Sequence, residues 1–237
     1  MRNNKKERSR KPKNRHLAKR YSGDRVLIVC EGSETEPNYL NALKEYFQLN
    51  KAAIVIVPSS GSAPQTVVKY AKDAMRDACR TGNPYAKVYC VIDKDMHPKY
   101  SNALQTIRDF DSEADEHCGT ILCAVPSVPC FEYWVLMHYS QSTRSFGSAG
   151  TSPCRQLIVT ALTTHIPGYQ KADRVLARKL ITTKLATARA NSARTLQAAK
   201  SAGTDDPSTK MHLLVDELEH LKTYRYFQDD QKGCPDN

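Results

Sequence analysis

Three acidic residues stand directly after apolar runs in this 237-residue sequence. Glu31 follows the run at residues 25–30, and Asp93 and Asp95 follow the run at residues 87–92. Both runs are short and rich in β-branched residues, which predicts buried strands. In an open parallel sheet, ligands bind beyond the carboxyl ends of the strands, so we expect the three side chains to converge on one crevice.

Converging carboxylates repel one another unless a cation lies between them. Hard oxygen ligands suit Mg²⁺ or Mn²⁺, so Glu31, Asp93 and Asp95 are predicted to hold one of these ions. Such an ion activates water and stabilises the charge that develops in an in-line displacement at phosphorus. Gly32 is expected to let a phosphate or a backbone segment approach Glu31 closely. The residue types and their spacing therefore indicate phosphodiester chemistry.

Three further residues are candidates for the same site. His97 is a candidate catalytic residue, as a general base or a phosphate contact, and a structural hydrogen bond is the alternative. Glu36 and Glu132 are candidates for a second metal or for support of the first metal's ligands, and Glu132 equally fits a structural role at a helix N-terminus. HAD-type phosphatases also carry an Asp-x-Asp after a strand. In those enzymes a threonine often occupies the place of His97, which makes a phosphatase the less favoured reading.

Strands and helices are predicted to alternate along the first part of the chain. The predicted strands cover residues 25–30, 53–57, 87–92 and 120–125. The predicted helices cover residues 35–47, 64–80, 100–117 and 131–139, the first with Thr35 as its N-cap. Near-continuous apolar strands joined by crossover helices indicate an α/β fold with a mostly parallel sheet flanked by helices.

The chain is expected to divide into four segments. They are a disordered basic tail (1–22), an α/β domain (23–140), a flexible loop (141–152) and a helical C-terminal region packing on that domain (153–237). In the last segment helices are predicted at residues 156–165, 175–202 and 208–226, with no further strand. Basic side chains along residues 175–202 form either a solvated face or a surface for nucleic acid.

Positive charge is concentrated at the N-terminus. The net charge is +10, and residues 1–20 contain ten basic residues against one acidic residue, so the tail holds +9 and the remainder +1. Such a tail is expected to bind a polyanion through phosphate contacts, or else only to solubilise the chain. The candidate nucleic-acid contacts are Arg8, Arg10, Lys11, Lys13, Arg15, Lys19, Arg20 and, outside the tail, Lys171.

The eight cysteines contain no CxxC pair, and Cys30, Cys90 and Cys123 lie inside apolar runs. We therefore expect buried reduced thiols, with structural zinc or disulfides as the alternatives. No apolar run is long enough to span a membrane, and the start of the sequence is polar and basic. A soluble cytoplasmic protein without membrane contact is predicted.

Several motifs, taken in order, resemble the RloB family. They are VCEGSETEPNY at 29–39, VIDKDMHP at 91–98, PCFEYW at 129–134, HY at 138–139, YQK at 169–171, DPST at 206–209 and HLLV at 212–215. The resemblance covers roughly residues 25–221 and implies a Toprim-like metal nuclease domain. Toprim sites use a glutamate after the first strand and an Asp-x-Asp after a later one, which matches Glu31, Asp93 and Asp95. His97 and Glu132 also match family positions.

The resemblance further implies a place beside an ABC-type ATPase in prokaryotic anti-phage defence loci. The resulting prediction is a Mg²⁺- or Mn²⁺-dependent endonuclease that cuts RNA, including tRNA, or DNA. The alternatives are a nucleic-acid-binding or ATPase-partner subunit with a regulatory or silent metal site, and a nucleotidyl transferase or phosphatase. The sequence has no GxxxxGK[ST] motif, so any ATP hydrolysis is expected from the partner. Whether the protein forms a homo-oligomer is left open by the sequence.

Overall fold

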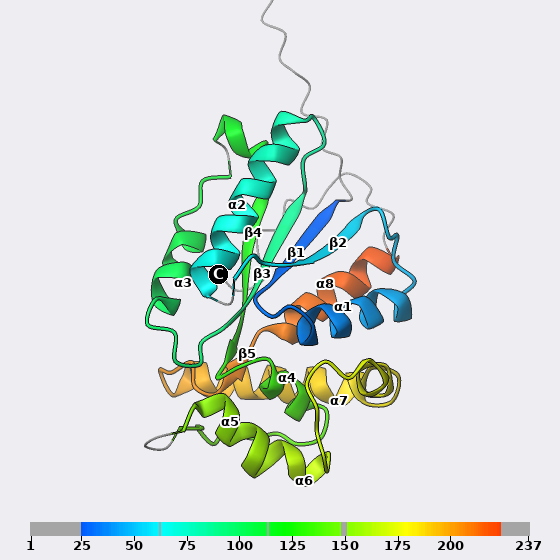
Figure 1. Ribbon diagram of the computed structural model, residues 1–237, viewed down its shortest axis with the longest axis vertical. Coiled ribbons are helices and arrows are strands. Elements are labelled where there is room, and N and C mark those ends of the chain that lie inside the picture. Colours follow the sequence, from blue (N-terminus) through cyan, green and yellow to red (C-terminus); the bar gives the residue numbers. More distant parts are fainter. Residues whose placement is uncertain (1–24, 62, 113, 148–150, 224–237) are drawn as a thin grey trace, which may run out of the picture.

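The computed structural model describes residues 25–61, 63–112, 114–147 and 151–223 (Figure 1). The predicted basic tail and its seven candidate nucleic-acid contacts lie outside these residues. None of the helices in the described part of the chain is long and apolar enough to cross a membrane.

Five strands form one sheet in the order β2-β1-β3-β4-β5. The strands are β1 (Val26–Cys30), β2 (Ile54–Pro58), β3 (Lys87–Asp93), β4 (Ile121–Val128) and β5 (Ser208–Thr209). The first four are parallel, and β5 runs antiparallel to the end of β4. The predicted α/β class with a mostly parallel sheet is confirmed.

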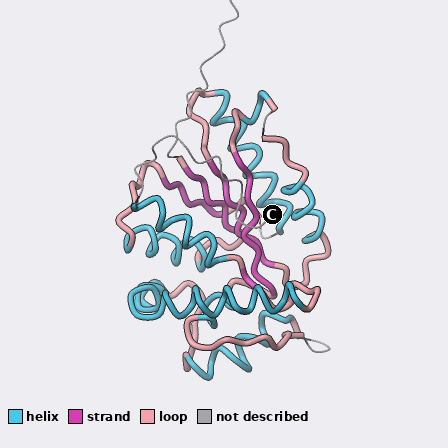
Figure 2. The backbone as a smooth tube through the Cα atoms, turned by 180° about the vertical axis from the view of Figure 1, so that it is seen from behind, coloured by secondary structure: helices cyan, strands magenta, loops and turns pink. Residues whose placement is uncertain are grey.

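Helices cover both faces of this sheet (Figures 1 and 2). They are α1 (Thr35–Tyr46), α2 (Pro64–Arg80), α3 (Tyr100–Arg108), α4 (Glu132–Met137), α5 (Pro153–Leu157), α6 (Thr163–His165), α7 (Arg174–Ser201) and α8 (Met211–Thr223). Helices α2 and α3 pack on one face, whereas α1 and α8 pack on the other. Helices α4 to α7 gather at the end of the sheet where β4 meets β5 (Figure 1). The predicted helical C-terminal region is thus confirmed.

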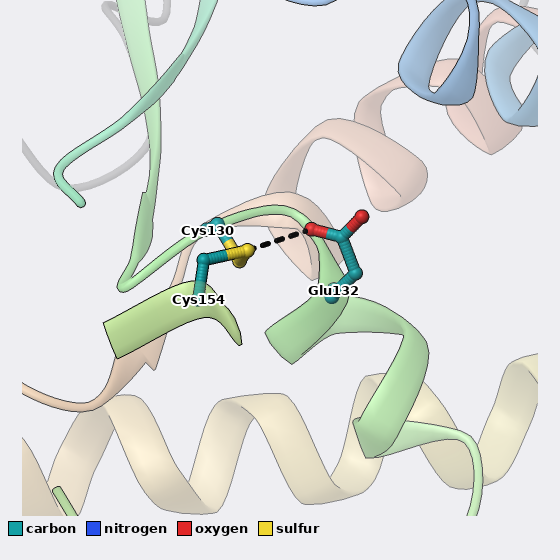
Figure 3. Close-up of side chains that lie close together, drawn as sticks. All are labelled: Cys130, Glu132 and Cys154. Atoms are coloured by element: carbon teal, nitrogen blue, oxygen red, sulfur yellow. Dashed lines mark hydrogen bonds between the residues drawn. A yellow bond between two sulfur atoms is a disulfide. The ribbon is translucent and has the colours of Figure 1, made fainter. Parts of the chain in front are cut away.

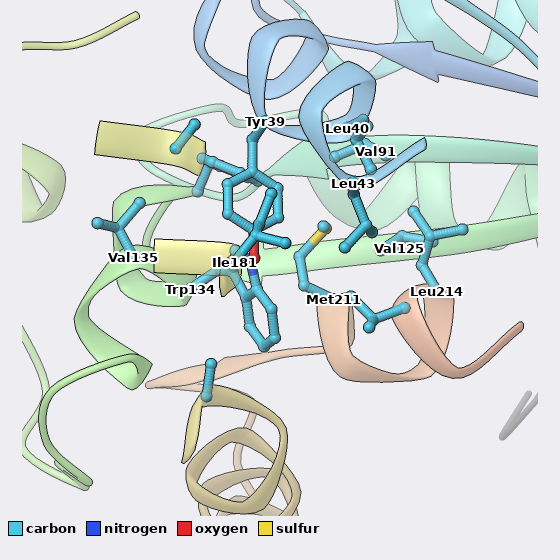
Figure 4. Packing of buried hydrophobic residues seen from close by; sticks show 14 of the residues in the cluster. Tyr39, Leu40, Leu43, Val91, Val125, Trp134, Val135, Ile181, Met211 and Leu214 are labelled. Atoms are coloured by element: carbon cyan, nitrogen blue, oxygen red, sulfur yellow. The ribbon is translucent and has the colours of Figure 1, made fainter. Parts of the chain in front are cut away.

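Burial on both faces explains why β1 reads as an unbroken apolar run. All five of its residues are buried, with alternate side chains entering the two cores. The larger core joins the sheet to α1, α4, α7 and α8, and Figure 4 shows Trp134 packed among side chains from these helices. Trp134 is completely buried, so the start of α4 is held rigidly beside the carboxyl end of the sheet.

The C-terminal region differs from the prediction in one respect, because it contributes strand β5. Ser127 pairs with Thr209 and Val128 with Ser208, and the hydroxyls of Ser127 and Thr209 lie 2.9 Å apart. Two residues are too short to produce an alternating pattern, and their partner is about eighty positions away in the sequence. The helix expected at residues 208–226 accordingly begins only at Met211.

Helix boundaries also differ from the prediction. Helix α3 ends at Arg108, and a separate 3₁₀ turn at Asp115–His117 replaces the second half of the expected helix. The segment expected as one helix at 156–165 begins at Pro153 and contains a π-helical stretch at Ile158–Leu162. Thr35 is the first helical residue of α1, and the preceding residue supplies no side-chain cap. Side-chain caps occur instead at α5, from Ser152, and at α7, from Asp173.

The expectation of reduced thiols is wrong for two pairs of cysteines in the structure. Disulfides join Cys79 to Cys118 and Cys130 to Cys154, with Cα atoms 5.7 and 5.6 Å apart. The partners are 39 and 24 residues apart, so local spacing could not show that they meet. Cys30 and Cys90 are free and buried, as predicted, whereas Cys123, which was also expected to be reduced, is disulfide-bonded.

Candidate metal site

Glu31 and Asp93 meet at the carboxyl ends of two neighbouring strands. Strands β1 and β3 pair in parallel with Cys30 opposite Val91, so the residues that follow lie side by side. The backbone N–H of Asp93 donates to Oε2 of Glu31 over 3.0 Å. The sheet order, with β1 next to β3, therefore creates the crevice that the sequence predicted.

The side chain of Asp93 is the least compensated carboxyl group of the site. Its Oδ1 atom is buried and accepts no hydrogen bond from any described residue. Burial raises its pKa well above the usual range, and the neighbouring Glu36, Glu132 and Glu31 raise it further, although the Phe131 backbone N–H opposes the shift. A buried carboxylate oxygen without a donor is a natural ligand for a cation.

Glu36 approaches the same place from the first turn of α1. Its side chain is buried, and its Oε1 accepts a hydrogen bond of 3.2 Å from the Gly32 backbone N–H. A Cβ atom added to Gly32 would lie 2.1 Å from Oε2 of Glu36. Gly32 was expected to make room for a phosphate beside Glu31, but in the structure it makes room for the Glu36 carboxyl. Burial, followed by the charge of Glu132, raises the pKa of Glu36.

Glu132 approaches from the start of α4 and forms an ion pair with Lys171, a basic residue in the lining of the cavity. Its side chain is almost completely buried. Nζ of Lys171 lies 2.9 Å from Oε1 of Glu132, and the Tyr169 hydroxyl lies 3.5 Å from the same oxygen. Lys171 stands just before α7 and is more than half exposed. Its side chain therefore offers a positive charge at the boundary between the buried carboxyl groups and solvent.

These carboxyl groups share a cavity of about 440 Å³. Its lining consists of Glu31, Gly32, Ser33, Glu34, Thr35, Glu36, Asp93, Phe131, Glu132, Lys171 and Ala172. Four of these acidic residues, namely Glu31, Glu36, Asp93 and Glu132, have buried or largely buried side chains. Their oxygens fit Mg²⁺ or Mn²⁺, because hard cations prefer carboxylate ligands and tolerate several of them at one place.

Burial and repulsion also act on Glu31. Its side chain is only 8% exposed. Burial raises its pKa to about 7, assisted by the charges of Glu36 and Asp95 and opposed by the hydrogen bond from the Asp93 N–H. Nε2 of His97 lies 3.1 Å from Oε1 of Glu31, so His97 contacts the oxygen that Asp93 leaves free. His97 is in position to orient Glu31.

Asp95 is not part of the cavity lining, although its charge acts on Glu31. Its φ angle is +27°, its backbone N–H donates to the Pro129 carbonyl over 2.7 Å, and its Oδ1 lies 3.4 Å from the Cys154 backbone nitrogen. The structure thus brings Glu31 and Asp93 together as predicted and adds Glu36 and Glu132 to them. It places Asp95 between the end of the sheet and the first turn of α5.

The pair Cys130 and Cys154 lies directly beside Glu132, a neighbourhood that the sequence interpretation missed. Sγ of Cys154 lies 3.3 Å from Oε2 of Glu132, the carboxyl oxygen not bound by Lys171 (Figure 3). A signal was present in the sequence, since Cys130 is two positions before Glu132. The contribution of Cys154 depends on how α5 packs, which no local pattern shows.

Comparison with known proteins supplies a family. A model of the RloB-like protein family matches residues 26–218, which covers most of the chain. The chain belongs to the RloB-like family. The RloB-like match includes every acidic residue of the cavity and extends through α7 into α8. No curated protein and no solved structure matches the chain.

Proposed function

We propose that the protein is a nuclease that depends on Mg²⁺ or Mn²⁺ and hydrolyses phosphodiester bonds in RNA, including tRNA, or in DNA. The observation that carries the proposal is the buried Asp93 oxygen without a donor, surrounded by three further carboxyl groups at one cavity. Removing such charge from water is costly unless a cation compensates it. This arrangement also supports the Toprim-like site that the resemblance implies.

Glu31 and Asp93 would hold the ion, and Asp95 joins them if its side chain turns back from Cys154. Glu36 and Glu132 would hold a second ion or fix the position of the first. When bound, the metal activates water and stabilises charge on the phosphate in an in-line displacement. The large cavity and its open side admit a phosphate of a polymer backbone.

Three residues of the chain would assist this reaction. His97 positions Glu31 through the contact at 3.1 Å. Lys171 lies at the mouth of the carboxylate cavity, where its ammonium can neutralise a phosphate oxygen as well as Glu132. Gly32 keeps Glu36 in place through its backbone N–H and its missing side chain.

The proposal places the protein in the cytoplasm, in an anti-phage defence system with an ABC-type ATPase as partner. We also propose that the basic residues of the tail and Lys171 bind nucleic acid. Contacts of this kind weaken steeply with salt, because binding releases counterions from the polyanion.

The test is cleavage of labelled single-stranded RNA and DNA, duplexes and tRNA with Mg²⁺, Mn²⁺ or EDTA, with and without an ABC-type ATPase of the proposed kind. We expect cutting that requires the metal and falls by roughly a hundredfold or more in Asp93→Asn and Glu31→Gln, since several kcal/mol of charge stabilisation are lost. Glu34→Gln is the matched control, because Glu34 lines the same cavity but is exposed.

Two outcomes would count against a nuclease. Cutting that is equally fast in wild type and Asp93→Asn would place the activity elsewhere. Binding of nucleic acid without any cutting, in the presence of the ATPase, would favour the alternative of a binding subunit with a silent metal site.

A further inference from the structure

We propose that Cys130, Glu132 and Cys154 form a Zn²⁺ site when their disulfide is reduced. The ligand atoms of these three residues all lie within 4.8 Å of one another, and all three residues are buried. Figure 3 shows both sulfur atoms and the carboxyl group turned toward one point between the end of β4 and the first turn of α5. Among the described residues, no other three His, Cys, Asp or Glu side chains bring their ligand atoms this close together.

The distances suit a tetrahedral zinc ion. With Zn–S near 2.3 Å and Zn–O near 2.1 Å, tetrahedral angles place a sulfur and an oxygen ligand about 3.6 Å apart. Sγ of Cys154 and Oε2 of Glu132 are 3.3 Å apart in the structure. Two sulfur ligands would lie about 3.8 Å apart. The sulfur atoms of Cys130 and Cys154 are bonded to each other here, so they must separate by side-chain rotation after reduction.

The position of Cys154 beside Glu132 also suits the reduced form of the pair. In the structure the sulfur belongs to the disulfide and has no hydrogen to donate. A thiol in the same place donates to Oε2, and a thiolate shares a cation with it. The approach at 3.3 Å therefore suits the chemistry of the dithiol better than that of the disulfide.

The charges of the site balance. Two thiolates and one carboxylate carry three negative charges, which Zn²⁺ reduces to one. Lys171 supplies the remaining positive charge through its ion pair of 2.9 Å with the other oxygen of Glu132. This compensation offsets part of the cost of removing the thiolates and the carboxylate from water. Thiolates are soft ligands and select Zn²⁺, whereas Mg²⁺ prefers the carboxylates of the cavity.

The redox step needs a reductant. A phosphine takes up an oxygen atom from water, becomes a phosphine oxide and delivers two electrons and two protons to the disulfide, which yields two thiols. Zinc binding then displaces the two thiol protons into solvent. Cys130, Glu132 and Cys154 provide three ligands, and a water completes the tetrahedron.

The full-length protein, reduced by a phosphine without oxygen, is titrated with Co²⁺ as a spectroscopic probe and with Zn²⁺. We expect near-ultraviolet absorption from thiolate bound to Co²⁺ and about one equivalent of Zn²⁺ retained after gel filtration. The oxidised protein should show neither. Glu132→Gln keeps both thiols and should weaken Zn²⁺ binding at least tenfold.

The double variant Cys130→Ser/Cys154→Ser should lose the absorption band. The matched control is Cys79→Ser/Cys118→Ser, which removes the other disulfide and should keep the band. Circular dichroism verifies that each variant is folded. The proposal is overturned if reduced wild type shows no thiolate band, or if the band survives in Cys130→Ser/Cys154→Ser. Since binding is the readout, the result is independent of whether the protein cuts nucleic acid.

Discussion

Replacing Glu31 by Gln should stabilise the protein when metal is absent. In the wild type this carboxyl is buried, and its pKa is raised to about 7. Above that pH the folded state must hold a charge that it disfavours, whereas the unfolded chain ionises freely from pH 4.5 upward. The amide of Gln has no charge, and its oxygen still accepts the hydrogen bond from the Asp93 N–H.

The size of the effect follows from the shift. A pKa that rises from 4.5 to about 7 corresponds to about 3 kcal/mol of lost stability at pH 8, because each unit is worth about 1.4 kcal/mol. At pH 5 the folded carboxyl is protonated and the loss falls to about 1 kcal/mol or less. Glu31→Gln should therefore raise the melting temperature by roughly 6–12 °C at pH 8 and by much less at pH 5.

The assay is thermal and urea unfolding in EDTA at pH 8 and pH 5, with exposed Glu34→Gln as the control. Added Mg²⁺ should stabilise the wild type at pH 8 and should not stabilise Glu31→Gln. The reasoning is refuted if Glu31→Gln is no more stable than the wild type at pH 8 in EDTA, or if its advantage is the same at both values of pH.

Two further predictions concern buried polar groups away from the cavity. Burial lowers the pKa of His138 to about 4, so its neutral form stabilises the fold above pH 6.5 and this contribution disappears as the pH falls toward 4. Acidification from pH 7 to pH 4.5 should therefore lower the free energy of unfolding by about 2.5 kcal/mol less in His138→Gln than in the wild type. The exposed His165→Gln should behave like the wild type. Glu217 of α8 pairs with the largely buried Lys87 over 2.8 Å, so Glu217→Ala should cost about 2–3 kcal/mol in urea unfolding. The double change Lys87→Met/Glu217→Leu should recover most of that loss, and equal destabilisation by the single and double variants would show that the pair is not the cause.

The sequence predicts the edge of the sheet well, because the signal there is local. An apolar run that is buried on both faces identifies β1 and β3, and the first polar residue after each run marks its carboxyl end. Glu31 and Asp93 were placed in one crevice on this basis, and the structure joins them by a hydrogen bond. The role of Asp95 was inferred from its spacing and from the resemblance to Toprim sites. In the structure its backbone is left-handed and its Oδ1 lies 3.4 Å from the Cys154 backbone nitrogen, an arrangement that spacing does not show.

Features that depend on distant partners were beyond sequence patterns. Strand β5 exists because Thr209 meets Ser127 of β4, and the residues around Thr209 carry no strand signal of their own. Lys171 reaches Glu132 only because the segment before α7 passes over α4 and α1. Packing of that kind is decided by the whole core, in which α1 and α7 face each other, and not by any run of ten or twenty residues.

The buried carboxyl groups that support the proposed metal site also predict how metal binding depends on pH. Glu31, Glu36, Asp93 and Glu132 face it, and Lys171 neutralises only one of them. The remaining charges require either protons or cations, and the raised pKa values of Glu31, Glu36 and Asp93 show that protons compete for the same oxygens. The proposed metal would therefore displace protons on binding, and its binding would weaken as the pH falls below about 7, where Glu31 takes up its proton. If these carboxyl groups served structure alone, adding Mg²⁺ at pH 8 would not raise the stability of the protein. If they form a metal site, Mg²⁺ binds at pH 8 and raises the stability.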